Sequence, residues 1–305
     1  MASTMPQPES RVWDPKPNVL ARRLERSRAV HARRFLSAAG VYLGLTLASL
    51  LFMLPFFWVV TTSLKTLGDA FLYPPQWIPN PPQWSNYVEA LRPHPFDRFF
   101  LNSSIITGLD IVGRLISCSL IAFSFARLRW YGRDVMFIAM LSLMMLPNQV
   151  TMIPQFIVFK EFGWIDSFLP LIVPTFFGHP FYVFLLRQFF MGIPRELDDA
   201  ARIDGASSLG ILTRIILPLS KPALATVAIF TFQWSWNEFL LPLIYIHSRT
   251  RYTVPLGLLG FQDEFGTQWT LLMAAALVTM LPVLLVFFFA QKYFIQGIAF
   301  TGLKG

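Results

Sequence analysis

The chain has 305 residues, of which 54% are hydrophobic and 14% are charged, and its formal net charge is +8. This share of apolar residues is too high for an ordinary soluble domain, and the apolar residues come in long runs. The composition therefore indicates a membrane protein, in which the basic residues report topology and not a nucleic-acid partner.

Six apolar runs are long enough to cross the hydrocarbon core of a bilayer, which takes about 20 residues in a helix. We therefore expect an all-α membrane protein with six transmembrane helices. The expected organisation is a basic tail at residues 1–37, a membrane domain at 38–293 and a C-terminal tail at 294–305. The expected spans are residues 38–60, 99–125, 135–159, 168–190, 222–246 and 269–289.

The distribution of lysine and arginine sets the expected orientation, because these residues concentrate in cytoplasmic loops. The N-terminal tail, residues 127–133, residues 187–221 and the C-terminal tail hold 18 of the 25 basic residues. The three alternate loops hold six, and Arg114 lies within a span. Both termini are therefore expected in the cytoplasm. The arginines just before the first span are expected to attract anionic lipid headgroups.

The segment at residues 61–98 follows the first span and is rich in proline and tryptophan. Its prolines disfavour long helices and central strands. The segment is expected to form a compact cap at the outer surface. Two roles stay open for it, namely an aromatic anchor at the membrane interface and a docking surface for an extracellular partner.

The second expected span contains two charged residues, Asp110 and Arg114, which lie four residues apart and so on one helix face. A lone charge at the bilayer centre costs about 2.5 to 3.5 kcal/mol on insertion scales, so we expect an intramembrane ion pair. The pair would brace the helix against another subunit. A proton relay is the alternative, and it is disfavoured because a paired arginine does not readily lose its proton.

Polar side chains in the third and fifth spans are candidates for a substrate pathway, since each costs free energy unless it faces a cavity or a partner. Trp236 adds a ring that can stack on a sugar beside groups that bind hydroxyls. Hydrogen bonding between helices is the alternative for each residue alone, and it is the role expected of His179. The candidate pathway residues are Asn148, Gln149, Gln233, Trp236, Asn237 and Glu238.

A polar stretch at residues 195–218 separates the fourth and fifth spans and reads RELDDAARIDGASSLGILTRIILP. Good helix formers begin it, Gly205 ends the first helix, and Ser207 or Ser208 caps a second. Apolar residues recur at three- and four-residue steps in the second helix until Pro218 stops it. The stretch is predicted to be a short helical hairpin with an apolar stripe formed by Leu209, Leu212, Ile215 and Ile216.

The spacing in this hairpin resembles the cytoplasmic coupling loop of ABC importer permeases. That family pattern is Glu-Ala-Ala, three residues, Gly, nine residues, Ile, any residue, Leu-Pro, and Asp199 stands here where the family usually has Glu. The sequences NQVTMIPQF, WNEFLLPL and QGIAFTGLKG resemble the carbohydrate-importer subfamily, in particular the smaller permease of maltose-type and glycerol-phosphate-type importers. The residues implied in coupling lie at about 194–218 and are Glu196, Asp198, Asp199, Ala200, Ala201, Gly205, Ile215, Leu217 and Pro218.

The resemblance implies a type I ABC importer permease fold in the cytoplasmic membrane of a bacterium or archaeon. The chain would form a heterodimer with a second permease and bind two ATP-binding subunits at the coupling loops. A substrate-binding protein outside the membrane would deliver a sugar, an oligosaccharide or a related polyol. ATP and magnesium would bind to the ATPase subunits and not to this chain.

The sequence has no phosphate-binding loop, no zinc-protease motif and no nucleophile elbow. We therefore expect no enzymatic activity, catalytic residue, metal or cofactor in this chain. An ion-coupled secondary transporter is the alternative function. It would account for the hydropathy and for the Asp110 and Arg114 pair, but it gives no account of the spaced loop.

Overall fold

The structure is a computed structural model that describes the backbone of residues 19–263 and 266–302. The side chains of residues 19–36, 148, 263 and 292–302 lie outside the description, and so do those of the expected N-terminal arginines and of most of the expected C-terminal tail. The chain divides into two compact units, residues 1–58 and 59–305.

The first expected span is part of helix α1 (Val19–Ser63). Its apolar part, Ser37–Ser63, has a mean hydropathy of 2.2 and is long enough to cross a membrane. Helix α1 starts well before this apolar part, so the backbone of the expected basic tail is helical from Val19 onward.

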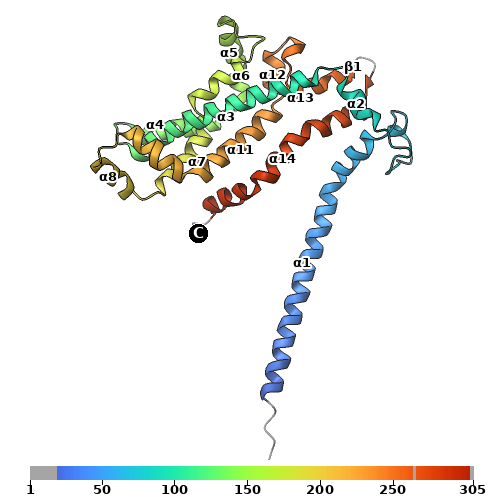
Figure 1. Cartoon of the computed structure of the whole chain (residues 1–305), viewed down its shortest axis with the longest axis horizontal. Coiled ribbons are helices and arrows are strands. Elements are labelled where there is room, and N and C mark those ends of the chain that lie inside the picture. The colour runs from blue at the N-terminus through green and yellow to red at the C-terminus, as the bar shows by residue number, and fades with distance from the viewer. Residues whose placement is uncertain (1–18, 264–265, 303–305) are drawn as a thin grey trace, which may run out of the picture. The chain divides into compact units, whose positions relative to one another are not determined.

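The second unit is built around helix α3 (Phe96–Arg127), beside which α7 (Pro180–Met191) and α11 (Lys221–Asn237) run (Figure 1). Helix α14 (Trp269–Gly302) packs against α11. Small residues recur every four positions on one face of α3, where they are fully or almost fully buried with the apolar face of α7. Such residues let two membrane helices approach closely. The small residues are Cys118, Ala122 and Ala126.

The fourth expected span is broken near its middle. It consists of α6 (Leu169–Ile172), the 3-10 helix η3 (Val173–Phe177) and α7, with Gly178 at φ 92° between η3 and α7. Gly113 lets α3 approach η3 closely. A Cβ atom at position 113 would lie 2.6 Å from Thr175 Oγ1 and 2.9 Å from the Phe176 ring. The backbones therefore meet without a side chain of residue 113 between them.

The third expected span is not one continuous helix, so that prediction was wrong in detail. Helix α4 (Arg133–Ser142) continues into η2 (Leu143–Met145), and α5 (Asn148–Glu161) follows at an angle of 100°. Pro147 disfavours helical geometry at the residue before it, and the backbone at the break is accordingly extended.

The fifth expected span is also broken. Helix α11 ends at Asn237, and α12 (Leu240–Tyr245) follows after two residues. At its other end, α11 meets the preceding helical segment at an angle of 80°. By length and composition, four helices of the described part can cross a membrane, or up to six if each bent pair is one span.

Short elements close the end of the second unit that lies farthest from α8 (Glu196–Ile203) (Figure 1). They are η1 (Asp69–Phe71), α2 (Ser85–Leu91), η5 (Arg249–Arg251), α13 (Val254–Gly257), η6 (Leu258–Phe261) and the paired strands β1 (Gln262–Asp263) and β2 (Gly266–Thr267). The buried Asn86 amide donates to the carbonyl oxygens of Ser63 and Lys65, both at 2.8 Å. These bonds join α2 to the start of the same proline-rich segment and so fold this segment back on itself.

Candidate functional site: a cavity and a helical hairpin

A cavity of about 820 Å³ opens between α3, α7, α11 and the start of α12. Its wall combines polar groups with aromatic rings. The polar residues are Arg114, His179, Gln233, Asn237 and Glu238, and the others are Phe181, Tyr182, Phe230, Trp234, Phe239 and Leu240. Three of the predicted pathway residues are therefore in one wall, and His179 joins them.

The α11 wall of the cavity follows helical periodicity. Phe230, Gln233, Trp234 and Asn237 lie at positions i, i+3, i+4 and i+7, which share one helix face. Trp236 falls outside this face, is 5% exposed and is stacked on Phe232. The expected stacking ring is therefore enclosed within the protein, and the tryptophan that lines the cavity is Trp234, which is 60% exposed.

Arg114 is held in the cavity wall by Asp110, with a distance of 2.5 Å between Arg114 Nε and Asp110 Oδ1. The guanidinium also lies over the Tyr182 ring, 5.4 Å from its centroid. Asp110 is 4% exposed, so the pair is almost removed from solvent. The arginine thus presents hydrogen-bond donors to the cavity while its charge is balanced.

The backbone break after α11 is stabilised by two of the predicted pathway residues. Glu238 Oε1 accepts the N–H groups of Leu240 at 2.9 Å and Leu241 at 3.2 Å, which caps the start of α12. The Asn237 amide donates to the Gln233 carbonyl oxygen at 2.7 Å. Gln149 is exposed on α5 and does not line the cavity, and the Asn148 side chain lies outside the described residues.

The predicted hairpin is present at the end of the unit near α4 (Figure 1). Helix α8 ends before Gly205, which has φ 80°. Ser207 Oγ accepts the Gly210 N–H at 3.2 Å and so caps α9 (Ser208–Ile211). A π-helical turn, η4 (Leu212–Ile216), and α10 (Leu217–Leu219) continue the same helical run.

The second helix of the hairpin ends at Leu219, one residue after Pro218 and close to the predicted end. Proline has no N–H for the usual helical bond, and the π turn directly before it accommodates this loss by a change of register. The predicted apolar stripe is buried only in part. Ile211, Leu212 and Ile216 are buried, whereas Leu209 is 61% exposed.

The acidic residues of α8 have different environments. Asp199 is exposed and pairs with Arg202, with Nη1 and Oδ1 2.9 Å apart, and Glu196 is also exposed. Asp198 is 3% exposed and faces Arg127 at the end of α3, at 3.4 Å. Asp198 therefore points into the protein, and its expected place among the coupling residues at a partner surface does not fit this geometry. Ala200 and Pro218 are exposed, whereas Ala201, Ile215 and Leu217 are half-buried.

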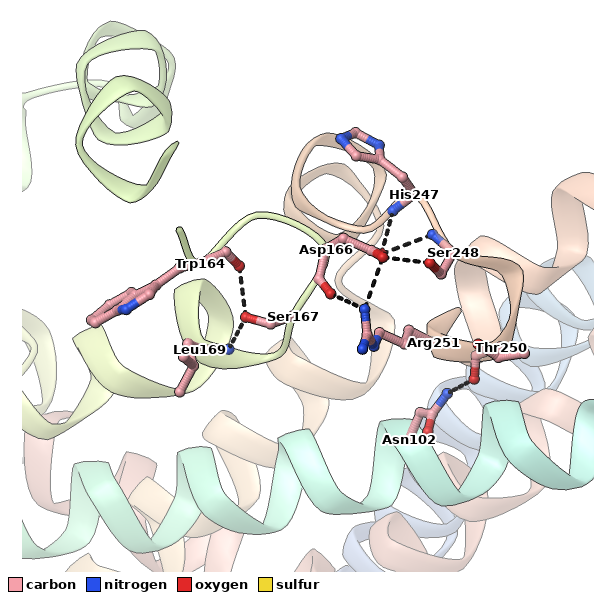
Figure 2. Close-up of polar contacts among 9 residues, drawn as sticks. All are labelled: Asn102, Trp164, Asp166, Ser167, Leu169, His247, Ser248, Thr250 and Arg251. Atoms are coloured by element: carbon pink, nitrogen blue, oxygen red, sulfur yellow. Dashed lines mark hydrogen bonds and ion pairs between the residues drawn. The ribbon is translucent and has the colours of Figure 1, made fainter. Parts of the chain in front are cut away.

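At the opposite end of the unit, Asp166 joins the loop before α6 to the loop after α12 (Figure 2). Its carboxylate accepts the His247 N–H at 3.0 Å, the Ser248 N–H at 2.8 Å and the Ser248 hydroxyl, and it pairs with Arg251 at 2.8 Å. These donors, led by the Ser248 hydroxyl, hold the pKa of Asp166 below its usual range. Asp166 has φ 56°, a region that aspartate tolerates better than most residues.

This loop contact is fixed to α3 by Asn102. The Asn102 amide donates to the carbonyl oxygens of Thr250 at 3.0 Å and Tyr252 at 2.9 Å. Ser167 adds a local turn by donating to the Trp164 carbonyl oxygen at 2.6 Å. No sequence motif predicts the contact between Asp166 and the loop after α12, because the two loops are about 80 residues apart in the chain.

Two parts of the site escaped prediction from the sequence. The first part is Phe230 and Trp234, which were not predicted. Their helical spacing from the predicted residue Gln233 is a signal that places them on the same face of α11. The contact between Arg127 and Asp198 has no such signal, because these residues lie on separate helices. Among the described residues, no three His, Cys, Asp or Glu side chains gather to hold a metal ion.

Residues 118–300 match the family described as binding-protein-dependent transport system inner membrane component. The chain is 35% identical over 260 residues to the arabinooligosaccharides transport system permease protein AraQ of Bacillus subtilis (strain 168), covering 84% of this chain and 92% of that protein. It is 33% identical over 255 residues to the melibiose/raffinose/stachyose import permease protein MelC of the same organism, covering 83% of this chain and 91% of that protein.

The fold is similar to a solved structure of a bacterial ABC transporter involved in the import of the acidic polysaccharide alginate. The TM-score is 0.75 at 24% sequence identity, and the match covers 86% of this chain and 97% of that chain. The architecture is therefore the type I importer permease fold. The family match includes α7, the hairpin, α11 and most of α14. The alternative function, an ion-coupled secondary transporter, is not the function of this family.

The cavity, the hairpin and the apolar spans thus belong to a multi-pass permease subunit of an ABC transporter for carbohydrates, in the cytoplasmic membrane. The chain belongs to the family of inner membrane components of binding-protein-dependent transport systems.

Proposed function

We propose that this permease carries a neutral sugar or short oligosaccharide through the cavity between α3, α7 and α11. The carrying observation is the wall itself, in which the exposed Trp234 ring stands on the same helix face as the amides of Gln233 and Asn237. An aromatic face stacks on a sugar ring, and amides bind hydroxyl groups as donors and acceptors. A volume of about 820 Å³ lies within the usual range of small-molecule sites, roughly 300–1,000 Å³.

The charge balance of the cavity favours a neutral cargo. Asp110 compensates Arg114, and one carboxylate oxygen of Glu238 already accepts two backbone N–H groups. The pair adds no net charge to the wall, and the Glu238 carboxylate would repel an anionic cargo, so the wall suits a neutral one. The names of the relatives AraQ and MelC refer to arabinooligosaccharides and to melibiose, raffinose and stachyose, which agree with this class.

The hairpin is the proposed docking site for an ATP-binding subunit. Its outer surface exposes the apolar side chains of Leu197, Ile203 and Leu209 beside the carboxylates of Glu196 and Asp199. An apolar patch with a charged rim is typical of a protein interface. In this proposal a second permease completes the pathway, two ATPase subunits hold ATP and magnesium, and both termini of this chain face the cytoplasm.

The test is uptake by the complex of this chain with its second permease, ATPase and binding protein, reconstituted in proteoliposomes. Labelled arabinooligosaccharides, melibiose and raffinose serve as probes. We expect Gln233→Ala and Asn237→Ala to lower uptake while the complex stays assembled. Asp134→Asn is the control, because Asp134 is an exposed residue outside the cavity and the hairpin. Unchanged uptake in both cavity variants would place the pathway elsewhere.

A further inference from the structure

Arg127, the last residue of α3, joins three elements through one guanidinium group. Its Nη2 donates to the carbonyl oxygens of Phe190 and Ile193, both at 2.7 Å, where α7 ends. Its Nη1 lies 3.4 Å from Asp198 Oδ2 in the first turn of α8. The exposed fractions of the Arg127 and Asp198 side chains are 1% and 4%. The charged contact is therefore enclosed at the base of the hairpin.

The electrostatics of the helix ends explain why these groups meet. The last carbonyl groups of a helix lack partners within it and favour a cation, which Arg127 supplies to α7. The first turn of a helix favours an anion, which Asp198 supplies to α8. Arg127 is thus fixed by the carbonyl group of Phe190 in α7 and by that of Ile193 just after the helix, while Asp198 connects α8 to this fixed point.

The two helices that meet at Arg127 also form the cavity. Arg114 precedes Arg127 by 13 residues on α3, a distance of about 20 Å at the helical rise. Tyr182 precedes Phe190 by eight residues on α7, about 12 Å. Both Arg114 and Tyr182 line the cavity. A displacement of α8 that is passed to Arg127 therefore reaches both of these cavity walls through continuous helices.

The hairpin has a separate attachment to the core that does not depend on this contact. Ile211, Leu212 and Ile216 of its second helix are buried in the main apolar cluster. Loss of the charged contact would leave these residues packed, but α8 could then move without moving the ends of α3 and α7. The apolar attachment holds the hairpin, whereas the charged contact determines whether α8 and the cavity helices move together.

We infer that Arg127 and Asp198 are positioning residues that transmit movement of the ATPase-docked hairpin to the cavity. The inference rests on the proposed function of the hairpin and adds a route within this chain. The route is α8 to Arg127, and from there along α3 and α7. It requires that a variant at Asp198 still binds the ATPase and still hydrolyses ATP, but no longer changes the cavity in response to nucleotide.

The experiment measures nucleotide-dependent access to the cavity in the assembled complex. A single cysteine, Gln233→Cys, is placed in a Cys118→Ala background, and its labelling by a maleimide is followed with and without ATP and vanadate. The test variant is Asp198→Asn, which keeps the size of the side chain and leaves the bonds of Arg127 to α7 in place. Asp198→Glu keeps the charge, and Asp134→Asn removes an exposed charge near the same end.

We expect Asp198→Asn to retain the ATPase subunit and ATP hydrolysis while the nucleotide-dependent change in labelling falls by about fivefold or more, the scale of ordinary coupling between sites. Asp198→Glu and Asp134→Asn should keep the change. Arg127→Met should behave like Asp198→Asn. If the Arg127→Met protein does not accumulate in the membrane, the inference is decided by comparing the labelling responses of Asp198→Asn and Asp198→Glu.

A normal labelling response in Asp198→Asn would overturn the inference. Failure of Asp198→Asn to accumulate or to assemble would overturn it as well, because the contact would then serve folding. A parent complex that binds no ATPase, or whose cavity does not respond to nucleotide, would instead contradict the proposed function.

Discussion

Trp234 and Trp236 lie on different faces of α11 although only one residue separates them. The Trp234 ring lines the cavity and is 60% exposed. The Trp236 ring is 5% exposed, and its Nε1–H donates to the Thr279 carbonyl oxygen of α14 at 3.2 Å. Trp234 is thus available to the proposed cargo, whereas Trp236 packs between helices.

Alanine at these two positions should therefore have different effects. Trp236→Ala is expected to lower the free energy of unfolding by about 3–5 kcal/mol, because it leaves a large cavity in the core. Trp234→Ala is expected to lower uptake and leave thermal unfolding of the purified complex close to that of the parent. Equal destabilisation by both changes would contradict the assignment.

Gly205 offers a test of the hairpin turn in which only the backbone matters. A Cβ at position 205 would meet no atom within 4 Å, so the cost of substitution comes from φ 80° and is about 1–2 kcal/mol. Gly205→Val should reduce ATPase co-purification and coupled transport, while Gly205→Asn, which tolerates this φ, should keep both. Gly132 is a matched control, with φ 81° and equally open space, because it lies outside the hairpin. Loss of ATPase binding in Gly132→Val would show that strain alone explains the effect.

The Asp110 and Arg114 pair predicts a specific pattern of damage. One charge left alone at membrane depth costs about 2.5–3.5 kcal/mol on insertion scales. Either Asp110→Asn or Arg114→Gln should therefore lower the amount of assembled permease more than the double change does. Assembly is the measurement, because Arg114 also lines the cavity and uptake will fall in any case. If the double variant is as poorly assembled as the worse single variant, the pairing is not what stabilises these charges.

The loop contact at Asp166 should depend on pH in a defined direction. Its folded pKa lies below the value of an unfolded aspartate, about 3.9. The contact therefore stabilises the protein fully above about pH 4 and is lost as the pH falls through the lower folded pKa. Asp166→Asn tolerates the backbone at φ 56° but removes the charge. The measurement is thermal unfolding of the parent and of Asp166→Asn as a function of pH. The difference in stability between the two should be constant above pH 5 and shrink below pH 4. A difference that grows in acid would contradict the stabilising role of the Asp166 carboxylate.

The orientation of the spans remains a prediction that labelling can test. In a Cys118→Ala background, single cysteines at Asn80 and Ser208 lie on exposed positions. Position 208 is preferable to 207, since Ser207 caps α9. An impermeant thiol reagent added outside cells should label position 80 and not position 208. Labelling of both from outside would disprove the topology.

The sequence predicts most of the helices because runs of apolar residues and helix caps are local signals. It correctly places α3, α14 and the hairpin turn at Gly205, where chain length, hydropathy and glycine each act within a few residues. It does not place the break at Pro147 or the π turn before Pro218. A proline is compatible with a kink, a break or a π turn, and the packing of neighbouring helices selects among them.

The candidate site was predicted in part for the same reason. Gln233, Asn237 and Glu238 were found because polar residues within a span are rare. The choice between Trp234 and Trp236 depended on which face of α11 turns toward α14, a long-range property. The Asp198 side chain was likewise fixed by Arg127, which lies 71 residues before it in the chain.

The contact of α3 with η3 at Gly113 has a consequence for how this sequence can vary. Because a methyl group at position 113 would lie within 3 Å of both Thr175 and Phe176, a larger residue there requires smaller residues at 175 and 176 in the same protein. Each change made alone would give either a clash or a void. Positions 113, 175 and 176 are therefore expected to covary, so that distant permeases with a side chain at the first position have lost bulk at the other two.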